Sequence, residues 1–134
     1  MCKFQGYIDF KMPDISPLTG PKLHPICQSE LMNLFPMRKE QTVLKSQIKK
    51  RLNELENDPQ KLNNYPGWFE RLGTYDGYMI YSLRFNHAKD LANLRILFVM
   101  NDKQPMFIHA FQEKKGGVDY KKAIDITVNR LKES

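Results

Sequence analysis

Apolar residues recur at helical spacing between Arg38 and Asn57. Residues of this stripe lie three or four positions apart, at Leu44, Ile48, Leu52 and Leu55. The other faces of the same stretch carry Lys39, Lys45, Lys49, Lys50 and Arg51. Because this spacing places one apolar stripe on a helix, the pattern predicts an amphipathic helix with a solvated basic face. Asn57-Asp58-Pro59 predicts its end, since the residue before a proline disfavours helical geometry.

Three later segments are rich in aromatic, branched and large apolar residues, which is typical of β-strands. They run from Tyr78 to Phe85, from Leu94 to Met100 and from Met106 to Phe111. The connections between them are short and polar, so we expect an antiparallel meander.

The middle segment places one charge in an apolar strand. By the period-two rule, one face of this strand is formed by Leu94, Ile96, Phe98 and Met100. Arg95 falls on the opposite face, beside Leu97 and Val99. After the basic turn Lys114-Lys115-Gly116-Gly117, Asp119 is placed to cap a closing helix. The residues of that helix expected to face inward are Ala123, Ile124, Thr127, Val128 and Leu131.

The region before Arg38 has a different pattern. Four prolines and Gly20 lie between Met12 and Pro25, so we expect an extended arm or loop there rather than a regular helix or central strand. Residues 4–10 allow a short edge strand, and residues 26–34 allow one or two helical turns. We interpret residues 1–37 as an N-terminal extension of one domain spanning 38–134. Residues 61–76 are expected to form a connector, with Trp68, Phe69 and Leu72 packed on the core.

Composition limits the class of protein. The 134 residues are 41% hydrophobic and 27% charged, as expected for a globular chain. No apolar run approaches the roughly 20 residues that cross a bilayer, so we expect a cytoplasmic protein with no membrane partner. Cys2 and Cys27 lack neighbouring ligand residues at metal-binding spacing, and we expect reduced thiols. The net charge of +6 favours a polyanionic partner, such as nucleic acid, an acidic protein or anionic lipid.

Three sequence words resemble the RelE/ParE toxins, in particular their phage-derived Gp49-like and HigB branch. These words are Ile80-Tyr-Ser-Leu-Arg-Phe85, Leu94-Arg-Ile-Leu-Phe98 and His109-Ala-Phe-Gln-Glu-Lys-Lys115, followed by Tyr120. The resemblance covers roughly Lys39 to Lys132. It implies an α+β fold, with an antiparallel sheet of three to four strands, helices packed on one face and a C-terminal helix.

The resemblance also implies a function. Such a protein is the toxin of a type II toxin–antitoxin system, cleaves mRNA on the ribosome, and is inhibited by a cognate antitoxin, which we expect to be a small helix-turn-helix protein. Cleavage proceeds by attack of the ribose 2′-hydroxyl on its own phosphate, which requires no metal and no cofactor. The protein must align the reacting atoms and balance the charge that develops on the phosphate.

Four residues are candidates for the catalytic site. Arg95 offers paired donors to phosphate oxygens or else forms a structural ion pair. Lys114 corresponds to the catalytic-turn cation of the superfamily. His109 either transfers a proton or is packed and hydrogen-bonded. Tyr120 stacks on a base, holds a phosphate, or covers the core at the start of the helix.

Four further residues are RNA-binding candidates. Arg84 occupies the Leu-Arg position of the family and either binds RNA or pairs with an acidic residue. Lys115 is either a phosphate contact or a solvated lysine. Tyr81 and Tyr78 are candidates for base contacts, with Tyr81 expected in the cleft if Ile80 faces the core.

The chain also departs from the family. It has Met79 and Tyr81 where some members place lysines on the first strand of the meander, and it lacks a C-terminal His-Tyr pair. These departures leave the general base unassigned. The alternatives are a ParE-like inhibitor of DNA gyrase and a non-catalytic phage-derived protein that binds a partner or nucleic acid.

Overall fold

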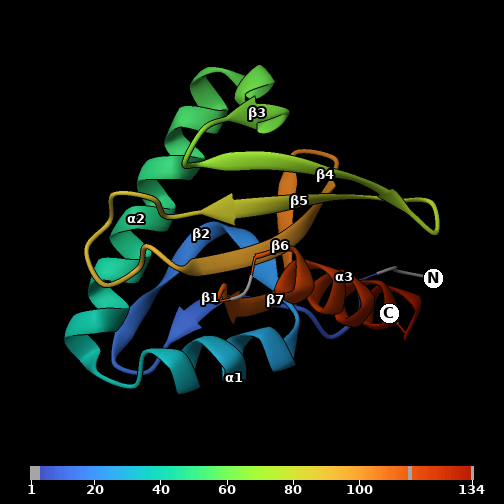
Figure 1. Ribbon diagram of the computed structural model, residues 1–134. Coiled ribbons are helices and arrows are strands. Elements are labelled where there is room, and N and C mark those ends of the chain that lie inside the picture. Colours follow the sequence, from blue (N-terminus) through green and yellow to red (C-terminus); the bar gives the residue numbers. More distant parts are fainter. Residues whose placement is uncertain (1–3, 115, 134) are drawn as a thin grey trace.

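A computed structural model describes residues 4–114 and 116–133 as an α+β fold around one sheet (Figure 1). The seven strands have the spatial order β1-β2-β7-β6-β5-β4-β3. Their bounds are β1 Ile8–Met12, β2 Ile15–Leu23, β3 Asn64–Tyr65, β4 Phe69–Tyr75, β5 Tyr78–Arg84, β6 Leu94–Asn101 and β7 Gln104–Gln112. The helices are α1 Pro25–Leu34, α2 Arg38–Asn57 and α3 Gly117–Glu133, and the short 3-10 helix η1 spans Pro59–Leu62. All neighbouring strands pair antiparallel except β2 and β7, which are parallel.

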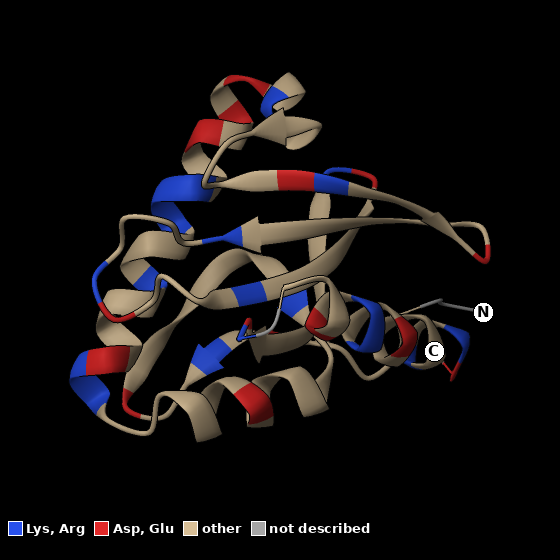
Figure 2. Cartoon of the chain, in the orientation of Figure 1, with Lys and Arg blue, Asp and Glu red and all other residues tan. Residues whose placement is uncertain are grey.

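Strand β6 lies at the centre of the sheet and is apolar on both faces. Leu94, Ile96 and Phe98 belong to the larger core cluster, whereas Leu97 and Val99 belong to the second one. The predicted alternation is therefore confirmed. Apart from one basic segment, β6 is free of charged residues in Figure 2. Because both faces are apolar, both must be covered to exclude water.

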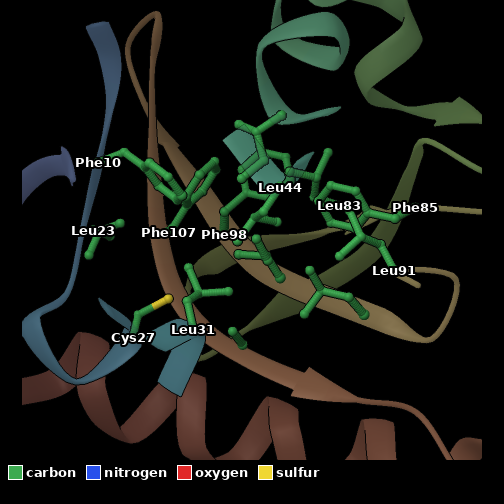
Figure 3. Close-up of a cluster of buried hydrophobic side chains, with 14 of the residues drawn as sticks. Phe10, Leu23, Cys27, Leu31, Leu44, Leu83, Phe85, Leu91, Phe98 and Phe107 are labelled. Carbon is green, nitrogen blue, oxygen red and sulfur yellow. The ribbon is translucent and has the colours of Figure 1, made fainter. Parts of the chain in front are cut away.

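Different helices cover the two faces. Leu44, Ile48 and Leu55 of α2 pack with Phe98 and Phe107 in the larger cluster, together with residues of α1 (Figure 3). On the other face, the second cluster includes Ala123, Val128 and Leu131 of α3. The expectation that the helices pack on one face of a three- to four-stranded sheet is therefore wrong. The three-strand meander and its flanking helices α2 and α3 are confirmed.

The N-terminal segment belongs to the same sheet and core. Residues 15–23, expected to be an arm or loop, form β2, which lies between β1 and β7. The prolines are tolerated because β2 pairs with β7 only at Lys22 and Leu23, beyond Pro17 and Pro21. Pro25 occupies the first turn of α1, where a missing N–H costs nothing. The segment for which the sequence allowed one or two helical turns forms a ten-residue helix.

Residues 61–76 are not a simple connector, and this expectation is also wrong. Phe69–Tyr75 forms β4, which joins β5 in an antiparallel hairpin through Asp76 and Gly77. The glycines of this segment concealed the strand, because Gly73 lies at an irregularity in the β4–β5 register, where its φ is +129°. Phe69 is 1% exposed and packs in the main core, as expected.

Arg51 of α2 is buried rather than solvated. Its side chain lies between the rings of Trp68 and Phe85, with Cζ 4.9 Å and 4.8 Å from their centroids. Its Nε donates to the backbone oxygen of Arg84 over 2.6 Å, and Nη1 donates to Gln47. Burial lowers the pKa of Arg51 to about 10, so the group stays charged at neutral pH. Arg51 thus ties α2 to the end of β5.

Cys27 is buried in the main core with a free thiol whose pKa is raised by burial. Cys2 lies outside the described residues. Within residues 4–114 and 116–133, none of the helices combines the length and the apolar character needed to cross a membrane.

Replacement of Arg51 by alanine should destabilise the fold. The change removes the packing between Trp68 and Phe85 and leaves the carbonyl of Arg84 without its donor. We expect the free energy of unfolding to fall by roughly 2–4 kcal/mol, measured by urea denaturation. Lys49→Ala, on the exposed side of the same helix, should change it by less than about 0.5 kcal/mol. Equal effects of the two substitutions would contradict this role of Arg51.

Candidate functional site

Two arginines lie side by side on the face of the sheet that α3 covers. Arg84 at the end of β5 and Arg95 at the start of β6 are directly opposite in the antiparallel register. Directly opposed residues on neighbouring strands point to the same face, with Cβ atoms roughly 5 Å apart. Two like charges at this distance repel each other, so the site must supply counter-charges.

Two carboxylates supply these charges, Glu70 of β4 and Glu113, which follows the last residue of β7. Arg95 donates from Nε to Glu113 Oε2 over 2.8 Å, and from Nη1 to the backbone oxygens of Ala92 and Leu94. Arg84 forms an ion pair with Glu70 of β4, and Glu113 also acts electrostatically on it. The sequence left open whether these arginines bind RNA or pair with acidic residues, and in the structure both are paired. Nη2 of Arg95 bonds to none of the described residues.

Tyr120, in the first turn of α3, packs beside Arg84. Its ring centroid lies 5.6 Å from Cζ of Arg84 and 5.4 Å from the Phe111 centroid, in an edge-on contact. Its hydroxyl forms a 3.0 Å hydrogen bond with Ser82 Oγ. We refer to Ser82, Arg84, Arg95 and Tyr120, with the carboxylates Glu70 and Glu113, as the arginine–tyrosine cluster. Strands β4 to β7 and helix α3 all contribute to it or border it.

The basic turn follows the cluster in the chain. Lys114 comes directly after Glu113 and is exposed, and its backbone N–H donates to Asp119 Oδ2 over 2.6 Å. Its ammonium group forms no ion pair with any residue in the described ranges. Lys115, the other predicted cation of this turn, lies outside the described residues.

His109 is bound into a separate network where α1, β7 and α3 meet. Its Nδ1 lies 2.9 Å from Glu30 Oε2, and its ring stacks on Phe111 at 5.6 Å. Arg130 of α3 donates two 2.9 Å hydrogen bonds to the same carboxylate, and the backbone N–H of Ala110 donates a further one. Phe111 lies between His109 and Tyr120, so the histidine is one ring removed from the cluster.

The carboxyl group of Glu30 remains ionised well into the acid range. Burial by itself would raise its pKa, but the hydrogen bonds from His109 and Arg130 outweigh burial and hold the pKa at about 2. The network therefore contains a permanent negative charge at neutral pH, joined to a cation and a histidine.

The two remaining tyrosine candidates lie away from the cluster. Tyr81 faces the α2 side, stacked on Phe98 at 5.5 Å, because Ile80 takes the opposite face. It lines a groove of about 960 Å³ between α2, β2 and the β6–β7 turn. Tyr78 faces the same side as Arg84 but begins β5, roughly 20 Å along the strand from it.

Several residues of these sites were not singled out from the sequence. Glu113 stood inside the quoted third word without an assigned role, and Glu70 stood in the supposed connector. Glu30 and Arg130 are separated from His109 by 79 and 21 residues along the chain, so no local spacing could reveal their contact.

The cluster combines the groups needed to bind an anion and to move a proton. Guanidinium groups offer planar donors to phosphate oxygens, and a carboxylate or a phenol can exchange a proton. In the part of the chain that the structure describes, no three His, Cys, Asp or Glu side chains converge as metal ligands.

The charge of Glu30 should make stability depend on pH. Its pKa lies below the ordinary value of 4.5 in the folded state, so its stabilising effect is present above that value and is lost as the pH falls toward about 2. Thermal unfolding followed from pH 6 to pH 2 should show this loss in the wild type. Glu30→Gln should flatten it, whereas the exposed control Glu56→Gln should not. An unchanged pH profile in Glu30→Gln would contradict the ionised network.

Comparison with known proteins does not assign the chain to a family. No family model matches it, and neither the curated proteins nor the solved structures include a significant match.

Proposed function

We propose that this protein is a toxin of a type II toxin–antitoxin pair, resembling the RelE/ParE toxins, and that it cleaves mRNA without a metal ion. In this proposal it acts in the cytoplasm on ribosome-bound messages and is inhibited by a small helix-turn-helix antitoxin. The three sequence words support the resemblance to this family, and the arginine–tyrosine cluster supports the proposed chemistry.

The observation that carries the proposal is the pairing of Arg84 with Arg95 beside Tyr120. Two arginines directly opposed on one sheet face suit the two non-bridging oxygens of a phosphodiester. A tyrosine next to them suits an unstacked base, because aromatic faces bind bases at roughly 1–3 kcal/mol each. A site with both features favours single-stranded RNA over a small metabolite.

The order of elements also supports the resemblance. Helix α2, the meander of β5, β6 and β7, the turn containing Lys114, and helix α3 follow one another as the resemblance implies. Each of the three sequence words lies on one of the meander strands, and the third runs on into the turn.

The proposed reaction is transesterification within the RNA strand. The 2′-oxygen forms a bond to phosphorus while the bond from phosphorus to the 5′-oxygen of the next nucleotide breaks. In this proposal Glu113 accepts the proton of the 2′-hydroxyl, and a water molecule from the solvent donates a proton to the departing 5′-oxygen. Arg84, Arg95 and Lys114 balance the negative charge on the phosphate. The products are a 2′,3′-cyclic phosphate and a 5′-hydroxyl.

Glu113 is preferred to His109 as the proton acceptor because of its place in the cluster. Its carboxylate contacts Arg95 over 2.8 Å, and its side chain remains 23% exposed. His109 is 6% exposed, and Phe111 separates it from Tyr120. The exposed Lys114 beside the cluster also suits an acidic covering segment in the antitoxin, since complementary charges favour association.

Conservative substitutions in the cluster should strongly reduce cleavage and leave the fold intact. We expect Glu113→Gln to lower the rate of message cleavage by roughly a hundredfold or more, the size of a general-base contribution. Arg84→Lys should have a similar effect, because lysine lacks the planar donors of arginine. The measurement is induced expression, with growth followed and RNA 5′ ends mapped across translated messages.

Two features of the design make the result decisive. Arg71→Lys is the matched control for Arg84→Lys, because Arg71 is an exposed arginine on the neighbouring strand β4, opposite Tyr81. Circular dichroism of each purified variant checks folding. Growth arrest with intact messages and DNA damage signalling would replace this proposal by gyrase inhibition. If the wild type causes neither growth arrest nor new 5′ ends, the remaining interpretation is a non-catalytic binding protein.

A further inference from the structure

The exposed face of α2 carries basic residues in a regular arrangement. Arg38 and Lys49 are eleven residues apart, and so are Lys39 and Lys50. Eleven residues make about three helical turns, so the four side chains form two pairs on the same side, roughly 16 Å apart. All four are exposed, and the exposed positions between the pairs carry the small residues Thr42, Val43 and Ser46. In Figure 2, basic segments recur along α2, with acidic ones near its two ends.

Two of the three acidic residues of α2 are engaged elsewhere, and the third, the exposed Glu56, lies seven residues beyond Lys49, outside the span between the two basic pairs. Glu40 accepts a hydrogen bond from the backbone N–H of Met37 at the start of the helix, and Glu54 pairs with Lys61 of η1. Within residues 4–114 and 116–133, none of the four basic residues forms an ion pair. Four unneutralised charges on one helix face form a site of positive potential.

The chemistry of the face indicates which polyanion it suits. Val43 is the one apolar side chain of α2 that is substantially exposed, so the face lacks the apolar stripe that inserts into a lipid surface. It also offers no free aromatic ring for base stacking, because the nearby Trp68 is already contacted by Arg51 and Lys50. Charges without apolar or stacking groups fit a ligand recognised by its phosphate backbone alone.

We propose that the exposed face of α2, formed by Arg38, Lys39, Lys49 and Lys50, binds the phosphate backbone of a nucleic-acid duplex. This surface lies on the opposite side of the sheet from the arginine–tyrosine cluster, because α2 and α3 cover different faces. It is a second nucleic-acid contact, which holds the protein on a base-paired region without contacting the base edges. Its binding is independent of RNA cleavage.

The test compares two lysine pairs that differ in position but not in charge. Lys49→Gln/Lys50→Gln removes two exposed lysines of α2, and Lys121→Gln/Lys122→Gln removes two exposed lysines of α3. Binding of a fluorescein-labelled RNA duplex, and of a DNA duplex of the same sequence, is measured by anisotropy from 50 to 200 mM salt. Because each phosphate contact contributes roughly 0.9 to the slope of log K against log salt, the α2 variant should lose roughly 2 from that slope. The α3 variant should keep the wild-type slope.

A second variant, Arg38→Gln/Lys39→Gln, should have the same effect as the first. Agreement between the two would exclude a local structural defect around Lys49 and Lys50 as the cause. Loss of binding to both duplexes, or to RNA alone, in the α2 variants supports the proposal, and the comparison identifies the duplex. Equal losses in the α2 and α3 variants would show attraction by net charge only and overturn it. Unchanged binding in the α2 variants, or binding by the wild type to an acidic polypeptide but to neither duplex, would also overturn it. Since the duplexes are not cleavage substrates, the result does not depend on whether the cluster is catalytic.

Discussion

The structure depends on the central strand β6 being apolar on both faces. A strand with Ile96 and Phe98 on one side and Leu97 and Val99 on the other is stable only between two covering layers. Helix α2 and helix α3 provide these layers, and the chain between them must cross the sheet from one face to the other. This division separates the molecule into an α2 face and an α3 face, which carry different polar groups.

The surroundings of Arg95, the single charged residue of β6, follow from that arrangement. Arg95 lies on the α3 face, 8% exposed, with its guanidinium held by Glu113 and by two backbone oxygens. An ion pair that is largely withdrawn from water is weak evidence for stability, because desolvation offsets much of the attraction. Its position opposite Arg84, which contacts the ring of Tyr120, supports the proposal that this charge binds a phosphate.

The N-terminal segment is joined to the rest through a second polar constraint. Glu30 of α1 accepts hydrogen bonds from β7 and from Arg130 of α3, at the place where β2 no longer pairs with β7. Along this stretch α1, rather than another strand, lies against β7, and the Glu30 carboxylate takes the backbone N–H of Ala110 that a neighbouring strand would otherwise satisfy. The helices on the two faces are thereby fixed relative to each other around His109, which explains why this histidine is packed and hydrogen-bonded.

The sequence by itself determined the elements whose signals are local. The helix from Arg38 to Asn57, the three meander strands and the side of β6 on which Arg95 lies all follow from apolar periodicity. Only the tertiary structure decided the pairing of distant segments, which leaves no local pattern: β2 beside β7, and Glu30 beside His109. Strand β4 was missed for a local reason, because Gly73 interrupts its pattern at an irregularity in the β4–β5 register. The sequence indicated Arg84, Arg95 and Tyr120 as candidates but not Glu70 and Glu113, the carboxylate partners of the two arginines. An ion pair is specified by two positions that meet only on folding.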